Sequence, residues 1–378
     1  MKLQTKKTLY MMLCLVLFST RTLTAGINGN VKTGIVSDSN VYGDYRNYGD
    51  SGMKTGAELL FMGKANDTVY PRFSFEYSSL EFPTYNLENQ NSSIFTGALK
   101  VLIGDMLTIS GEIGSDIYNR PYQDQYSTAL SYFTPSVTVS PYYYTDVSVG
   151  LVSNSVDYPN YDLDYSAAKT YLMLEQEVPL DATLKVISIT GNRDYSERLL
   201  YDTSSSTYPV LSSEYRRDTE SNYTVKLERY IEKIGDTVLA YSYEGLDSND
   251  NEFYWGALQT PDDSTPGDEQ VLSNYWDYGL TNLSFSLKSN ISQNLLLNLY
   301  WHSEEKTYVG WMARDSSDSF LSPAQSRHDT QQTLSVGIEM SNRNVTVNLK
   351  YENTANQSND YPYDYTGNVI TAGIKLYF

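Results

Sequence analysis

The sequence predicts an all-β protein, a closed antiparallel up-and-down transmembrane β-barrel of about sixteen strands. Three observations lead to this fold class. Apolar and polar residues alternate in segments of about ten residues. The connectors between these segments alternate between tight turns and long polar loops. The number of segments also suits a chain of 378 residues.

The predicted strands follow from the alternation of residue types. In one clear case Val69, Phe73 and Phe75 share a face, while Arg72 and Glu76 lie on the opposite face. Read this way, the chain predicts strands over residues 27–37, 54–64, 68–79, 94–104, 106–116, 126–134, 136–152, 166–178, 182–192, 220–232, 236–245, 278–289, 294–304, 331–341, 344–353 and 368–378.

The connectors show which ends of the strands lie together. Tight turns are expected at Lys64–Asp67, Gly104–Asp105, Thr134–Ser136, Pro179–Asp181, Glu232–Asp236, Ser289–Gln293 and Ser341–Asn344. Long loops are expected at Asp38–Met53, Arg193–Thr219, Leu246–Asp277 and Glu305–Thr330. Short turns at one end and long loops at the other are the layout of an outer-membrane barrel.

The N-terminus predicts a secretory signal peptide over residues 1–25. Lysines at the start precede an apolar stretch from Leu9 to Phe18, which is too short to span a bilayer, and cleavage is expected after Thr24 or Ala25. The only cysteine, Cys14, lies within this segment, so the mature chain is expected to have no disulfide. Residues 26–378 are then the barrel with its extracellular loops.

The last predicted strand completes the pattern. Apolar residues occupy alternate positions up to the terminal Phe378, and this strand is expected to pair with the first, because a sheet in lipid must close on itself. The pattern is similar to the C-terminal assembly signal of bacterial outer-membrane barrels. Over residues 26–378 the chain resembles outer-membrane porins of Gram-negative bacteria. The resemblance is one of architecture, without a residue-level motif, so no functional residue is carried over.

The resemblance implies export through the periplasm to the outer membrane, with membrane lipid and lipopolysaccharide as partners. It implies a porin, monomeric or homotrimeric, through whose water-filled channel small hydrophilic solutes or ions, sugars among them, diffuse passively. The alternative is a surface adhesin or binding protein whose loops carry the function and whose lumen is plugged. The connector Ile117–Gln125 is short, so a constriction is expected from another loop or from the wall.

Lumen-facing positions carry nearly equal numbers of cations and anions. These charges either simply avoid lipid, where one costs about 2–4 kcal/mol at mid-depth, or form opposed rows that set a transverse field across the pore. Arg72 with Glu76 and Lys226 with Glu228 are the preferred members of such rows. The candidate pore-lining residues are Arg72, Glu76, Lys100, Glu112, Glu175, Lys226, Glu228, Glu339, Lys350, Glu352 and Lys375.

A net charge of −19 makes the chain a poor ligand for nucleic acid. The residues Asp247, Asn249, Asp250 and Glu252 partly resemble a calcium loop, but glutamate occupies the sixth position, where that loop needs glycine. A solvated acidic loop is therefore the main expectation, and the four residues form at most a weak metal candidate. No cofactor is expected beyond divalent cations held loosely by acidic loops, where they bridge to lipopolysaccharide phosphates.

Two loop tryptophans, Trp255 and Trp311, have two interpretations. They either pack loop against loop or stack on a sugar ring at the mouth. Trp301 shares its parity with neighbouring leucines and is expected in an interfacial aromatic girdle. The two histidines, His302 and His328, lie in no arrangement that resembles a catalytic triad, so an enzyme is not expected.

Overall fold

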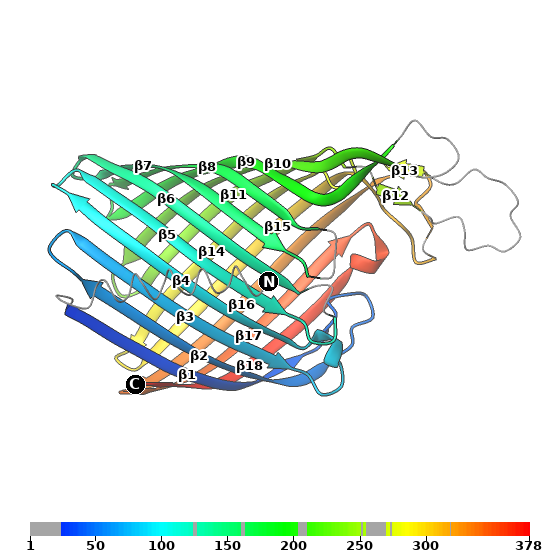
Figure 1. Cartoon of the computed structure of the whole chain (residues 1–378). Coiled ribbons are helices and arrows are strands. Elements are labelled where there is room, and N and C mark those ends of the chain that lie inside the picture. Colours follow the sequence, from blue (N-terminus) through cyan, green and yellow to red (C-terminus); the bar gives the residue numbers. More distant parts are fainter. Residues whose placement is uncertain are drawn as a thin grey trace, which may run out of the picture.

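The computed structural model describes residues 24–378 except 124–126, 160–162, 203–209, 251, 255–269, 273 and 318. Sixteen antiparallel strands close into one barrel, with the strands inclined to its axis (Figure 1). Each strand pairs with its neighbour in sequence, apart from a separate two-stranded ribbon, β12–β13, inserted between β11 and β14. Within the described residues no helix combines the length and hydrophobicity needed to cross a bilayer.

The strands are β1 (Thr24–Asp38), β2 (Asp50–Lys64), β3 (Val69–Glu81), β4 (Gln90–Ile103), β5 (Leu107–Asn119), β6 (Thr128–Tyr142), β7 (Thr145–Asp157), β8 (Tyr165–Val178), β9 (Ala182–Asp202), β10 (Val210–Ile231), β11 (Gly235–Ser248), β12 (Glu252–Tyr254), β13 (Gln270–Leu272), β14 (Tyr278–Ser292), β15 (Leu295–Met312), β16 (Ser326–Asn342), β17 (Val345–Ser358) and β18 (Tyr365–Tyr377). Short 3₁₀ turns, η1 (Asn86–Glu88) and η4 (Tyr361–Tyr363), lie in two of the long connectors. The predicted fold class is confirmed.

The barrel closes where β1 pairs with β18, as the sequence predicts. Gly34 lies opposite Gly373 at this seam, and the terminal Phe378 exchanges backbone hydrogen bonds with Gly29 at 3.0 and 3.2 Å. A Cβ on Gly34 would lie 2.5 Å from the carbonyl oxygen of Ala372, so the close approach of the two strands requires glycine there. Closure leaves no unpaired edge along the barrel.

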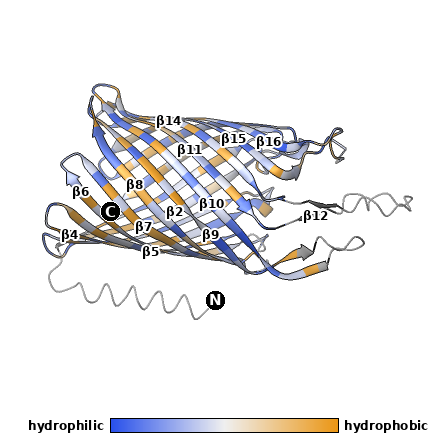
Figure 2. Cartoon of the chain, turned by 90° about the horizontal axis from the view of Figure 1, so that it is seen from above, coloured by the Kyte–Doolittle hydropathy of each residue, from blue (hydrophilic) through white to orange (hydrophobic). Residues whose placement is uncertain are grey.

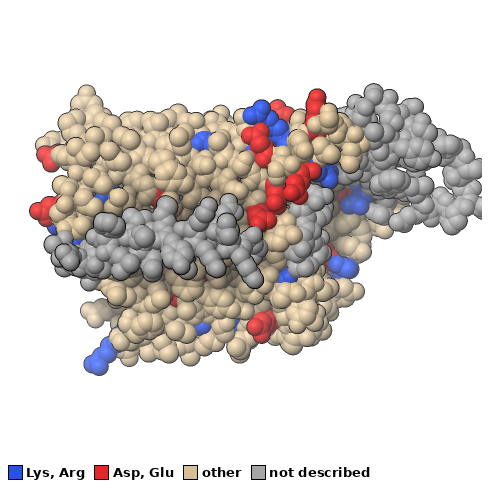
Figure 3. Space-filling model, viewed as in Figure 1, with Lys and Arg blue, Asp and Glu red and all other residues tan. Residues whose placement is uncertain are grey.

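The two faces of the wall differ in polarity. The outward-facing side chains of Ile27, Leu151 and Leu349 are 72%, 58% and 53% exposed. Apolar and polar residues alternate along the strands in Figure 2, and in Figure 3 the part of the barrel's middle that is not behind grey atoms carries few charges, while charged side chains gather nearer the two ends. Such a continuous apolar band is unfavourable in water and favourable in hydrocarbon.

One predicted turn is wrong. The segment Thr134–Ser136 is not a turn but the middle of β6, and the tight turn follows at Tyr143–Tyr144. Pro135 pairs in register with Gly111 of β5, while the ladder toward β7 is interrupted between Phe133 and Ser136. Proline is tolerated here because its missing N–H falls at that interruption.

One predicted loop is also wrong. Most of Arg193–Thr219 is strand, because β9 and β10 run for 21 and 22 residues and leave only residues 203–209 between them. The outward-facing side chains Asp194 and Arg217 form an ion pair at 2.9 Å, with 59% and 58% exposure. The strands lose their apolar alternation there because this part of the wall rises beyond the apolar band. The predicted strand 136–152 is wrong as well, because it joins the end of β6 to β7 across the turn at Tyr143–Tyr144, and the predicted strand 126–134 covers only the first half of β6. The other predicted strands occur within a few residues of their expected bounds, except where β15 and β16 extend further.

The predicted signal peptide lies outside the described residues, apart from Thr24 and Ala25 at the start of β1. The cleavage position stays a prediction.

Candidate functional site

Charged side chains on the lumen wall near the seam form one linked network. Lys32 lies 3.0 Å from Glu58 and 2.8 Å from Glu76, and Lys375 lies 3.0 Å from the other oxygen of Glu58. Asn30 donates a further hydrogen bond to Glu58 at 2.7 Å. The two lysines and two glutamates are joined across four neighbouring strands, so their charges are balanced locally.

A second network crosses the wall on the other side of the barrel. Lys185 lies 3.5 Å from Glu175 and 3.0 Å from Glu228. Of the preferred members of the opposed rows, Glu76 pairs with Lys32 and Glu228 pairs with Lys185, and the role of these rows in the pore stays a prediction. The remaining candidates are placed as follows: Lys350 pairs with Glu352 at 2.7 Å, Glu112 accepts from Tyr132 at 3.0 Å, Glu339 accepts from Asn298 at 2.9 Å, and within the described residues Arg72, Lys100 and Lys226 have no ion-pair partner.

The structure also contains a pocket that the sequence did not predict. A cavity of about 270 Å³, called here the mouth pocket, lies between the extracellular ends of β8–β11 and β14–β15. Seven aromatic and three basic side chains line it: Tyr158, Tyr165, Tyr195, Trp276, Tyr278, Tyr308 and Trp311, with Arg193, Arg216 and Lys306, and also Leu163 and Leu246.

The mouth pocket lies beyond the apolar band. At its height the exterior of the wall carries the ion pair Asp194–Arg217 and the side chain of Glu305, which is 62% exposed. Placing a charged group against lipid costs free energy, so this part of the barrel lies in water outside the membrane. The pocket therefore faces the extracellular entrance of the lumen.

Arg216 anchors one wall of the mouth pocket. Its guanidinium lies 4.6 Å from the ring centroids of both Tyr195 and Trp276, and it donates to Asp218 at 2.8 and 2.9 Å. Asp218 is fully buried and accepts further hydrogen bonds from Tyr195 at 2.9 Å and Ser248 at 2.6 Å. Burial raises the pKa of Tyr195, which keeps its hydroxyl protonated. The charge of Arg216 is therefore compensated by Asp218.

Lys306 occupies a different environment. Its ammonium lies 3.8 Å from the ring centroid of Tyr278 and 4.8 Å from that of Tyr308. Burial lowers the pKa of this lysine, while the carboxylates of Glu304, Glu244 and Asp329 raise it and Arg327 on β16 lowers it further. Within the described residues no oxygen accepts a hydrogen bond from the Lys306 amine.

Two more donors at the mouth pocket lack acceptors. The buried indole Nε1 of Trp276 and the buried Nε of Arg193 have no hydrogen-bond partner in the described part of the chain. Arg193 is held in place by an ion pair with Glu220 and by the ring of Tyr165, whose centroid lies 5.1 Å away. Buried donors usually have partners, so these two groups, together with the unbonded amine of Lys306, mark a site that is open to a ligand.

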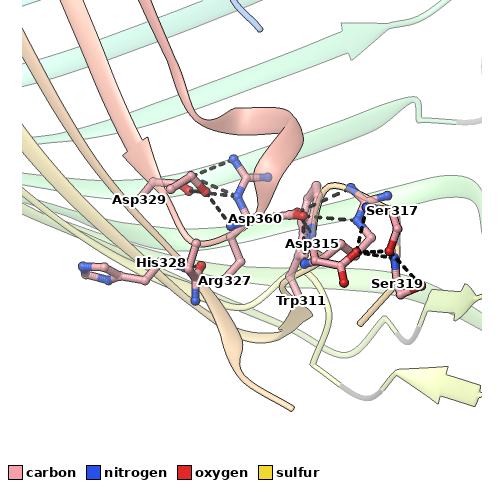
Figure 4. A network of polar contacts seen from close by, with 11 residues as sticks. Trp311, Asp315, Ser317, Ser319, Arg327, His328, Asp329 and Asp360 are labelled. Atoms are coloured by element: carbon pink, nitrogen blue, oxygen red, sulfur yellow. Dashed lines mark hydrogen bonds and ion pairs between the residues drawn. The ribbon is translucent and has the colours of Figure 1, made fainter. Parts of the chain in front are cut away.

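A neighbouring cluster fixes two extracellular connectors (Figure 4). Asp360 is fully buried and accepts from the Trp311 indole at 3.0 Å and from Arg314, through its backbone N at 3.1 Å and its Nε at 3.2 Å. Trp311 stacks on Tyr275 at 4.8 Å and 16°. Trp311 lies near the end of β15 and not in a loop, and it packs against the connectors that carry Tyr275 and Asp360 while also lining the mouth pocket. Trp255 lies outside the described residues.

The weak metal candidate stays a prediction, because the side chain of Glu252 lies outside the described residues. Asp250 is fully buried and lies 3.2 Å from Arg198 and 3.6 Å from Arg216, so its charge is already compensated. In the described ranges no group of three His, Cys, Asp or Glu side chains is arranged to hold a metal ion. His302 lies 3.4 Å from Glu304, and His328 lies 3.0 Å from Thr307.

Comparison with known proteins gives similarity of structure without similarity of sequence. No family model matches the chain, and no curated sequence does. Among solved structures, OccK3 (OpdO) of Pseudomonas aeruginosa has 11% identity and a TM-score of 0.46 over 94% of this chain and 96% of its own. OmpT, an outer membrane protein of Vibrio cholerae, has 11% identity and a TM-score of 0.46 over 95% and 98%. OccAB3 of Acinetobacter baumannii has 8% identity and a TM-score of 0.47 over 94% and 99%.

The strand pairing of this chain is by itself that of an outer-membrane barrel. The predicted class-level resemblance is therefore confirmed at the level of the fold.

Proposed function

We propose that this protein is an outer-membrane porin of a Gram-negative bacterium, through which small hydrophilic solutes or ions, sugars among them, diffuse passively. The observation that carries the proposal is a closed barrel of sixteen strands with an apolar exterior and a polar lumen. A barrel of this size is too wide for side chains to fill.

The wall charges support a water-filled lumen. The side chains of Glu58, Glu76 and Glu228 are 32%, 42% and 36% exposed although they face inward. Ionised carboxylates in a dry interior would be strongly destabilised, so their exposure is consistent with solvent in the lumen. Local ion pairing favours a pore that admits solutes of either charge with mild selectivity.

Single-channel recording tests the proposal directly. The detergent-refolded full chain, added to planar lipid bilayers, should give stable open steps that scale with the conductivity of the salt solution. A correctly folded protein that gives no steps would overturn the channel and favour the alternative, an adhesin or surface-binding barrel with a plugged lumen. Heat-dependent migration in gels establishes folding in both cases.

The remaining parts of the proposal concern partners. We expect the barrel to bind outer-membrane lipid and lipopolysaccharide, to have no enzymatic activity and to need no cofactor. Divalent cations held loosely by the acidic loops would bridge to lipopolysaccharide phosphates. Chemical cross-linking of the refolded protein distinguishes a monomer from a homotrimer, which the sequence left open.

A further inference from the structure

We propose that the mouth pocket binds a sugar ring that carries an oxyanion, either a carboxylate or a phosphate, at the extracellular entrance. The role of the pocket as a capture site for solutes that enter the lumen rests on the proposed channel function. As a binding site, it stands on the geometry of the pocket alone.

The walls of the pocket fit a ring. Tyr308 and Trp311 present aromatic faces whose centroids lie 5.2 Å apart at 54°, and Tyr278 lies 6.1 Å from Tyr308 at 56°. Lys306 lies over Tyr278 and Tyr308, and Arg327 lies over Tyr308 and Trp311, so a sugar would pack its C–H groups on the remaining ring surface while its hydroxyls stay at the polar edge. The cavity of about 270 Å³ is of a size for a small ligand and not for a polymer.

The donors fit an oxyanion. Lys306, Trp276 and Arg193 line the same cavity, and the Lys306 amine, the buried Trp276 Nε1 and the buried Arg193 Nε have no acceptor within the described residues. A ligand oxygen that accepts from a lysine ammonium or a guanidinium forms a charge-assisted hydrogen bond, which is stronger than a neutral one. A purely apolar ring would leave all three donors unpaired, and a cationic ligand would be repelled by Lys306.

The neighbouring acids do not supply this acceptor. Asp218 is occupied by Arg216, Tyr195 and Ser248, and Glu220 is occupied by Arg193. Glu244 accepts from the hydroxyl of Tyr278. The carboxylates around the pocket thus hold its walls in position, while the amine of Lys306 is left for the ligand.

The test is calorimetric titration of the refolded full chain with glucuronate, glucose 6-phosphate and glucose at low and high salt. Either anionic sugar should bind at least about tenfold more tightly than glucose, the effect of one charge-assisted hydrogen bond. Added salt should weaken this binding. The better of the two anions identifies the oxyanion as carboxylate or phosphate.

Lys306→Met is the informative variant, because it removes the charge and keeps most of the stem. It should reduce the affinity for the anionic sugars to that for glucose. Lys54→Met is the matched control, since Lys54 lies on β2 with the lumen-facing parity of Glu58, on a strand remote from the mouth pocket, and it should bind as the unmodified protein does. Trp276→Phe keeps a ring but loses its donor, and should weaken binding about threefold.

Equal binding of glucose and the anionic sugars would overturn the proposal, as would unchanged binding in a folded Lys306→Met protein, or the absence of binding by both anions. If Lys306→Met does not fold, Trp276→Phe decides in the same way. Calorimetry requires no open pore, so binding without conductance would refute the channel and leave this site intact.

Discussion

Replacing Asp360 with alanine should release the connector over residues 313–325 from the extracellular rim. Asp360 is fully buried and accepts hydrogen bonds from Trp311 and Arg314, two of them from the charged guanidinium at 3.2 and 3.4 Å. Breaking a buried ion pair costs about 3–5 kcal/mol. The Arg314 side chain is 20% exposed and recovers some hydration, which places the expected cost near the lower limit, about 3 kcal/mol.

A cost of this size changes the population of the locally open connector by about a hundredfold. Subtilisin digestion followed by mass spectrometry measures it, because cleavage within residues 313–325 tracks the open population when opening is fast relative to cleavage. Asp360→Asn, which keeps the shape of the side chain but loses its charge, should give an intermediate rate. Asp364→Ala changes an exposed carboxylate nearby and serves as control. Cleavage rates for Asp360→Ala and this control that agree within twofold would refute the reasoning.

Three further predictions concern the seam, the lumen and the mouth pocket. Gly34→Ala should lower the temperature at which the barrel unfolds in heat-dependent gel migration, because the added Cβ meets the backbone of the facing strand. Gly26→Ala is the control and should leave this temperature unchanged, since Gly26 has open space around it. Equal unfolding temperatures for the two variants would contradict the close approach. Neutralising Arg72 or Lys226 should shift the reversal potential in planar bilayers toward cation selectivity, and unchanged selectivity would count against a role of these residues in the pore. The pKa of Lys306 is lowered, so its amine loses its charge at a pH below the ordinary lysine value of about 10.4. Binding of anionic sugars should therefore weaken as pH rises through this pKa. A constant affinity up to a pH of about 10.4 would argue against a role of the Lys306 charge in binding.

The wall of the barrel is predictable from sequence because the alternation of apolar and polar residues is visible within each strand. Apolar alternation marks the residues that face lipid, and the pairing of neighbouring strands follows from short connectors. The prediction fails where this alternation ends. β9 and β10 continue beyond the apolar band, where Asp194 and Arg217 face water and nothing enforces alternation. Proline is typical of turns, so the sequence predicts a turn at Pro135. Only the pairing of β6 with β7 shows that this position needs no backbone N–H donor.

The contacts within the candidate sites need information that alternation does not contain. Residues four apart on one strand, such as Arg72 and Glu76, are separated by about 13 Å at 3.3 Å per residue. Glu76 instead reaches Lys32, two strands away. The mouth pocket likewise depends on the register between Arg193, Tyr278 and Lys306, which belong to segments far apart in the chain. The abundance of tyrosine was visible in the sequence, but its convergence on one cavity was not.

The pairing of β1 with β18 constrains how the molecule assembles. The ion pair between Lys375 and Glu58 joins residues separated by 317 positions, so the seam is a contact of very high sequence separation. The entropy of closing such a loop grows only slowly with length, but contacts of this kind form late in folding. Until they form, the incomplete sheet has two open edges whose amides have no partners in hydrocarbon. Insertion and closure must therefore occur together, and a stepwise route through stable, partly inserted sheets is disfavoured.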